Sequence, residues 1–101
     1  MGTLLPTTEK MKYKMNITIT YNGNERTFDL DCVFLCKEKD YGNKYYLSIT
    51  NNLGFNECLD IRYDTTFDIN KKEQYLVDWA YNYWTGKNSA WAIKSIEVIK
   101  L

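Results

Sequence analysis

Cysteine is the residue type whose spacing in this chain comes closest to a chemical site. Cys32 and Cys36 are separated by three residues, a spacing found among zinc ligands. The intervening Val33-Phe34-Leu35 predicts a continuous strand, on which these two residues lie about 13 Å apart, too far for one ion to bridge. We therefore expect Cys32 and Cys36 to be small buried hydrophobic residues, with Cys58 on a different strand and no metal site.

Carboxylates are the other groups that suggest chemistry. Asp29, Asp31, Asp60 and Asp64 lie on or beside predicted strands, and paired carboxylates can act as acid and base or hold a divalent cation. Acids that alternate along a strand more often form its solvated face. A metal-binding protein, in which Asp31, Glu57 or Asp60 completes a site with the cysteines, stays as an alternative.

The chain contains no histidine. Histidine is the side chain that usually moves protons near neutral pH and is a common metal ligand, so its absence excludes the standard serine and cysteine hydrolase triads. The glycines of the predicted domain are isolated at turns or at a helix end, without the spacing that cradles phosphates. We predict a protein that is not an enzyme, with no catalytic residues and no cofactor.

Composition narrows the class of partner. The 101 residues suit one small domain, and 13 basic residues balance 13 acidic ones. A chain with balanced charge has neither the broad basic surface of a nucleic-acid binder nor the excess of acidic residues of a DNA mimic. An odd number of cysteines and no secretory signal predict a reduced, cytoplasmic setting, and no apolar run is long enough to predict a membrane partner.

The segment Lys71–Gly86 predicts a helix with more aromatic surface than one core-facing stripe needs. A core stripe at i, i+3, i+4 and i+7 consists of Leu76, Trp79, Ala80 and Tyr83. A second stripe on the adjoining face consists of Val77, Tyr81 and Trp84. This second stripe either packs under the loop at residues 51–56 or forms a protein interface, where tyrosine and tryptophan are frequent. We predict the second stripe, together with Tyr46, as the partner-binding residues.

Helix ends and hairpin turns are also predicted. Asn70 and Glu73 predict a capping box at the start of the helix, and Gly86 predicts its end. Asn22-Gly23 predicts a type I′ hairpin turn, which places Ile17 opposite Phe28 and agrees with the alternation of apolar residues on both strands.

The later strands follow the same period of two. A second turn at Gly42-Asn43 predicts that Ile49 faces Cys36, and Glu57–Tyr63 predicts a fourth strand. In the last strand the apolar positions change parity between Ile93 and Ile96, which predicts a β-bulge.

These elements predict an α+β fold: a curled antiparallel sheet of about five strands in meander order, packed by one α-helix between the last two strands. Residues 1–14 are expected to be a mobile N-terminal extension and residues 15–101 a single domain. Val33 and Leu35 point away from the face of Phe34. We expect curling of the sheet and packing of the helix to bury both faces, because a domain of this size needs most of its apolar surface for its own core; the alternative is that the opposite face meets a partner.

Two other binding classes stay open. Single-stranded nucleic acid could bind a surface of lysines and tyrosines, namely Lys12, Lys14, Lys37, Lys39, Lys44, Tyr13, Tyr41, Tyr45 and Tyr46. Neutral net charge argues against direct nucleic-acid binding. A homodimer through the second helix stripe or an edge strand is the other class.

The chain resembles the small inhibitors that phages and plasmids encode against bacterial defence nucleases, the anti-CRISPR type among them. The resemblance comes from the short length, the single sheet with one helix, and the asparagine, lysine and tyrosine in NITITYNGNE and YGNKYYLSITNN. Its neutral charge differs from the acidic DNA-mimic members. The resemblance implies an inhibitor that blocks a host nuclease complex by occupying a protein surface or a nucleic-acid channel, and it implies no role for an individual residue.

Overall fold

The first hairpin follows from its turn. In the computed structural model, which describes residues 8–39, 42–86 and 91–101, Asn22 and Gly23 join β1 (Thr8–Tyr21) to β2 (Asn24–Lys39). Both turn residues have positive φ, 50° and 79°, as a type I′ turn requires. The predicted register is confirmed, with Ile17 opposite Phe28.

β1 begins earlier than the sequence predicts. Thr8 pairs with Lys37 and Tyr13 with Cys32, so residues 8–14 are strand and not an extension. The reason is that Met11 and Tyr13 continue the inward alternation of β1 and pack against the core. Residues 1–7 of the expected extension lie outside the described residues.

The second hairpin has a different register from the predicted one. In β3 (Gly42–Thr50), Ile49 lies opposite Cys32, and Cys36 lies opposite Tyr45. The predicted turn residues Gly42 and Asn43 are therefore part of β3, where they lie opposite Lys39 and Glu38. Because the register differs from the prediction by an even number of residues, each side chain keeps its expected face.

β4 (Asn56–Asp60) is shorter than the predicted fourth strand. The Asp60 carboxylate accepts a hydrogen bond from the backbone N–H of Arg62 at 3.1 Å, which starts the short 3-10 helix η1 (Ile61–Tyr63). As a result Ile61 is buried, whereas Tyr63 is 72% exposed.

The helix α1 (Lys72–Thr85) begins without the predicted capping box. Its N-cap is Lys71, with no side-chain capping bond, because the backbone N–H of Asn70 is donated to the side chain of Asp68 and that of Lys71 to the Asp68 carbonyl. The predicted end is confirmed: Gly86 follows the helix and donates its N–H to the Asn82 carbonyl.

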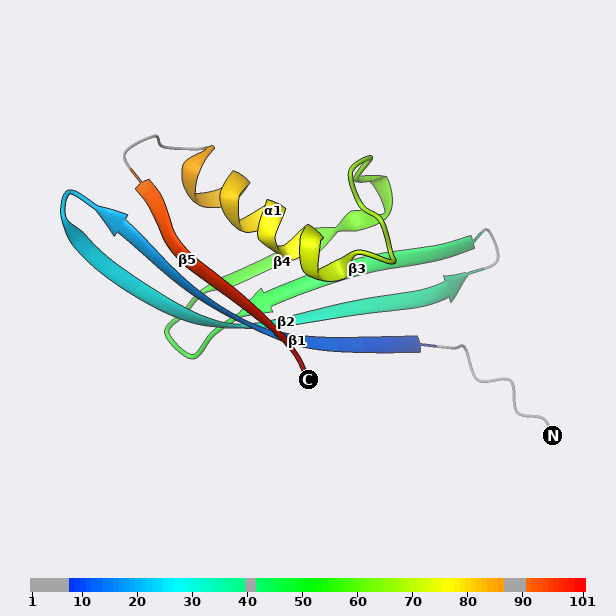
Figure 1. The fold of residues 1–101 in the computed structure, drawn as a ribbon. Helices are drawn as coiled ribbons and strands as arrows, with labels where there is room; N and C mark the ends of the chain where they lie inside the picture. Colours follow the sequence, from blue (N-terminus) through cyan, green and yellow to red (C-terminus); the bar gives the residue numbers. More distant parts are fainter. Residues whose placement is uncertain (1–7, 40–41, 87–90) are drawn as a thin grey trace.

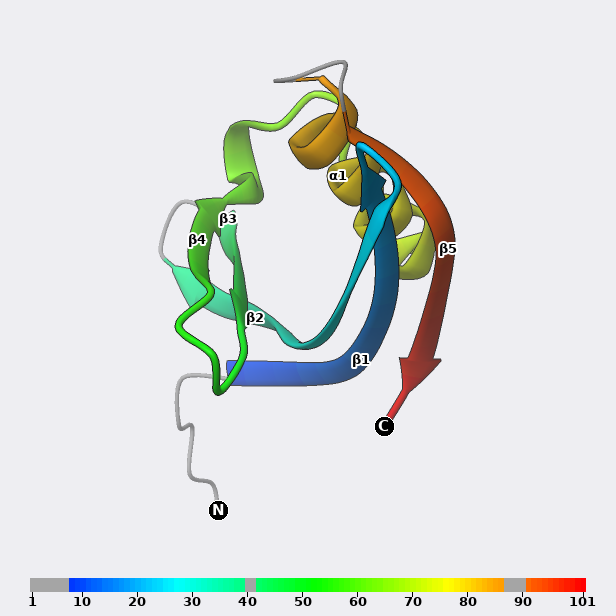
Figure 2. The same cartoon turned by 90° about the vertical axis from the view of Figure 1, so that its left-hand side faces the viewer.

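β5 (Trp91–Lys100) pairs with β1, and the strand order is β4-β3-β2-β1-β5 (Figure 1). The register shifts between Thr18 and Ile19 of β1, where Ser95 and Ile93 are the partners, which confirms the predicted bulge. The predicted α+β fold is therefore confirmed, with five antiparallel strands and one helix between the last two. The sheet curls, and α1 lies on its concave side (Figure 2).

The core fills the space between the concave face of the sheet and α1. The sheet contributes inward side chains from β1, β2 and β3, such as Ile17, Leu30 and Leu47, which are at most 1% exposed. The helix contributes Tyr75, Leu76, Ala80 and Trp84. No described helix is long and apolar enough to cross a membrane.

Candidate partner-binding surface

The helix buries a different line of residues from the one expected. Leu76 and Ala80 are fully buried, as predicted, but Trp79 and Tyr83 are only partly buried and pack at the edge of the core. Trp84, which was expected to be available to a partner, is 7% exposed.

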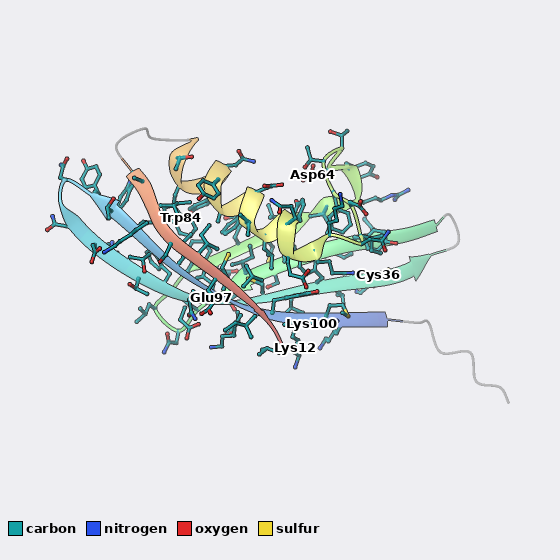
Figure 3. All side chains as sticks on the ribbon, viewed as in Figure 1. Lys12, Cys36, Asp64, Trp84, Glu97 and Lys100 are labelled. Atoms are coloured by element: carbon teal, nitrogen blue, oxygen red, sulfur yellow. The ribbon has the colours of Figure 1, made fainter. Side chains whose placement is uncertain are left out.

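Trp84 is buried because a loop covers it. Its ring stacks on Phe55, with centroids 6.0 Å apart, and packs against Phe28 of β2 at 5.6 Å. Trp84 therefore packs under the loop at residues 51–56, which is the first of the two alternatives given for the second stripe. The side chain points from α1 toward the sheet (Figure 3), and its 7% exposure leaves little of it for a partner to contact.

The other two residues of the second stripe differ in exposure. Val77 is partly buried, and Tyr81 is 47% exposed. Tyr81 is therefore the one large apolar side chain of this stripe that a partner can reach. A single exposed ring is common on protein surfaces and does not by itself define an interface.

The sheet offers a larger apolar surface on its convex side, here called the outer face. The pairing of Leu35 with Tyr46, and of Val33 with Ser48, places these four residues together on that face. Phe34 points the opposite way, into the core, where it contacts Tyr75 of α1. No helix or strand of the described chain packs over the outer face (Figure 2).

An apolar groove lies on the outer face. It has a volume of about 390 Å³, and the residues that line it include Lys10, Val33, Leu35, Tyr46, Ser48 and Cys58. This volume is in the range of binding pockets for small molecules. Tyr46 was predicted as a partner-binding residue, and the structure places it here, away from Tyr81. Curling and helix packing were expected to bury Val33 and Leu35, but α1 packs on the concave face alone, so these two side chains lie on the outer face and outside the core.

Charged groups surround the groove. Lys44 lies 3.9 Å from the carboxylate of Asp60, and its ammonium group is 5.5 Å from the centre of the Tyr46 ring. Farther along the outer face, Lys14 lies 3.3 Å from Asp29 and 3.4 Å from Asp31. Hydrogen bonds to these two carboxylates raise the pKa of Lys14, so this lysine stays charged.

The cysteines do not form a metal site in this structure. Cys32 is buried on the inner face, where burial and then the charge of Asp31 raise the pKa of its thiol to about 12. Cys58 is exposed and lines the groove on the opposite face. Within the described ranges, no group of three or more cysteine, aspartate or glutamate side chains is placed to hold a metal ion.

The predicted lysine and tyrosine surface is divided between the two faces. Lys12 and Lys37 share the outer face with Tyr46, and Lys12 lies on the side of the sheet away from α1 (Figure 3). Tyr13 is 3% exposed in the core, and Tyr45 packs against Phe67 on the inner side. Tyr41 and the side chain of Lys39 lie outside the described residues.

Comparisons of the chain with protein-family models, with curated proteins and with solved structures give no match.

Proposed function

We propose that this protein is a non-enzymatic binding module that attaches to a protein partner through the outer face of its sheet. The observation that supports this function is the apolar groove at Val33, Leu35 and Tyr46, which no described element covers. A small domain needs most of its apolar side chains for its own core, so apolar residues kept on an open face call for a second role.

A bacterial defence nuclease is the class of partner that we propose first, because of the resemblance to phage-encoded inhibitors. An inhibitor of this kind acts by occupying a surface in one-to-one proportion and needs no catalytic group. The proposal therefore agrees with a chain that has no histidine. It also places the protein in the bacterial cytoplasm, where these nucleases act.

The experiment is a titration of the full chain into a panel of purified RNA-guided nuclease complexes, with DNA cleavage as the readout. We expect one complex to lose cleavage at a one-to-one ratio. The Leu35→Glu variant should lose the inhibition, because it places a charge in the groove. Thr27→Glu is the matched control, since Thr27 lies exposed on the same strand and the same face but outside the groove.

Thermal unfolding of both variants establishes that they are folded before inhibition is compared. If the unchanged protein inhibits no complex in the panel, the defence-nuclease class is wrong. If Leu35→Glu inhibits as well as Thr27→Glu does, the outer face is not the surface that binds.

A further inference from the structure

The groove on the outer face has a basic border. Lys10 lies opposite Leu35 across the β1–β2 pair, and Lys12 lies opposite Val33. Directly paired residues have Cβ atoms about 5 Å apart, so the two lysines stand beside the apolar residues of the groove. Lys37 continues this surface on β2, opposite Lys44 on β3.

The positive charge of this border is not neutralised locally. Among the side chains that the structure describes, Lys10, Lys12 and Lys37 have no carboxylate within ion-pair distance. Asp60, the carboxylate that lines the groove, is paired with Lys44, and Asp29 and Asp31, farther along the outer face, are paired with Lys14. The chain is neutral as a whole, yet this part of its surface is positive.

We propose that the groove binds an acidic segment of a partner protein, with one large apolar side chain in the groove and flanking carboxylates on Lys10, Lys12 and Lys37. This inference rests on the proposed function and specifies the chemistry of its partner. The apolar lining provides the anchor position, and the three lysines provide charge complementarity.

The lining favours a protein segment over other anionic partners. Single-stranded nucleic acid binds on successive aromatic rings, whereas Tyr46 is the one aromatic side chain among the described residues that line this groove. An anionic membrane is bound by apolar groups that reach into the lipid, whereas Val33 and Leu35 line a hollow. A hollow instead accommodates a side chain that projects from a partner.

The test measures fluorescence anisotropy of a labelled peptide, acetyl-EEDFEED-amide, titrated with the full chain at low salt. We expect saturable binding that weakens as salt is added, because exposed charges are screened. A peptide with serine in place of its phenylalanine should bind about tenfold more weakly, since it has no apolar anchor. Equal binding of the two peptides would overturn the proposal.

Charge reversal tests the border. The double variant Lys10→Glu with Lys37→Glu should lose peptide binding. The matched control is Lys71→Glu with Lys100→Glu, which changes the net charge equally at exposed positions off the outer face and should bind as the unchanged protein does. If peptide binding falls equally in both double variants, the loss is caused by the change in net charge and not by the position of the lysines, and the proposal is overturned.

Three further measurements separate the competing occupants. Binding of oligothymidylate or of phosphatidylserine vesicles in place of the peptide would overturn the proposal, as would a homodimer in analytical ultracentrifugation that Leu35→Glu dissociates. If Leu35→Glu abolishes nuclease inhibition but the peptide never binds, the proposed function stands and the acidic-segment inference fails.

Discussion

Trp84 of α1 stacks on Phe55 of the loop between β3 and β4, with ring centroids 6.0 Å apart and ring planes inclined by 23°. Phe55 also contacts Trp79 at 6.1 Å and Tyr83 at 5.6 Å. Three aromatic rings of the helix therefore pack against this one loop residue. This contact explains why the aromatic excess of α1 belongs mainly to the core and not to a partner surface.

Phe55→Ala should lower the free energy of unfolding by about 2 to 3 kcal/mol, because it removes a partly buried ring and leaves the helix aromatics without their cover. Urea denaturation measures the change. Leu53→Ala in the same loop is the control, since Leu53 is 79% exposed and should change stability by less than about 0.5 kcal/mol. Equal losses would mean that Phe55 does not support the helix.

The fold could be predicted from the sequence where local chemistry fixes it. Asn22-Gly23 sets the first hairpin because a type I′ turn needs positive φ at both residues, and the alternation of apolar residues selects the same register. The bulge opposite Thr18 follows from the parity change in the last strand. These signals need no knowledge of tertiary contacts.

The helix face could not be predicted in the same way, because tertiary contacts choose between two adjoining stripes. Helical spacing allows either Trp79 or Trp84 to face the sheet, and Phe55, distant in sequence, determines that Trp84 does. The helix start was missed for a local reason: Asp68 accepts the backbone N–H of Asn70, which the predicted capping box would have donated to the side chain of Glu73. The outer-face groove depends on pairing among four strands and is likewise not visible in one segment.

Cysteine reactivity should differ strongly between the two faces of the sheet. Cys58 is exposed and should be alkylated by iodoacetamide in the folded protein. Cys32 is fully buried and burial raises the pKa of its thiol to about 12, so it should react only after unfolding. Peptide mass spectrometry after timed alkylation distinguishes the sites, and equal rates at both cysteines in the folded protein would contradict this placement.

The Tyr75 hydroxyl donates a hydrogen bond of 2.7 Å to the Asp64 carboxylate, and this bond, with others from Thr66, lowers the pKa of Asp64 from its usual 3.8. A carboxylate with a lowered pKa in the folded state stabilises the protein above the unfolded pKa, and this contribution is lost as pH falls through the folded pKa. Tyr75→Phe should therefore cost most stability near neutral pH and less below about pH 3.8.

Urea denaturation of the unchanged protein and of Tyr75→Phe at a series of pH values measures this difference. Thr85→Val, which removes a hydroxyl bonded to the Tyr81 carbonyl and no carboxylate contact, is the control and should give a difference independent of pH. A Tyr75→Phe effect that is equally independent of pH would show that the hydroxyl does not stabilise the Asp64 charge.

Phe34 and Leu35 are neighbours in β2 but point to opposite faces, and this alternation predicts opposite consequences of truncation. Phe34 is 4% exposed and contacts Tyr13 and Tyr75, so Phe34→Ala should lower the free energy of unfolding by about 3 to 4 kcal/mol. Leu35 is only partly buried, in the lining of the groove, so Leu35→Ala should cost less, about 1 to 2 kcal/mol. Urea denaturation compares the two; similar losses would show that Leu35 belongs to the core, and the outer face would then lack the spare apolar surface that a partner needs.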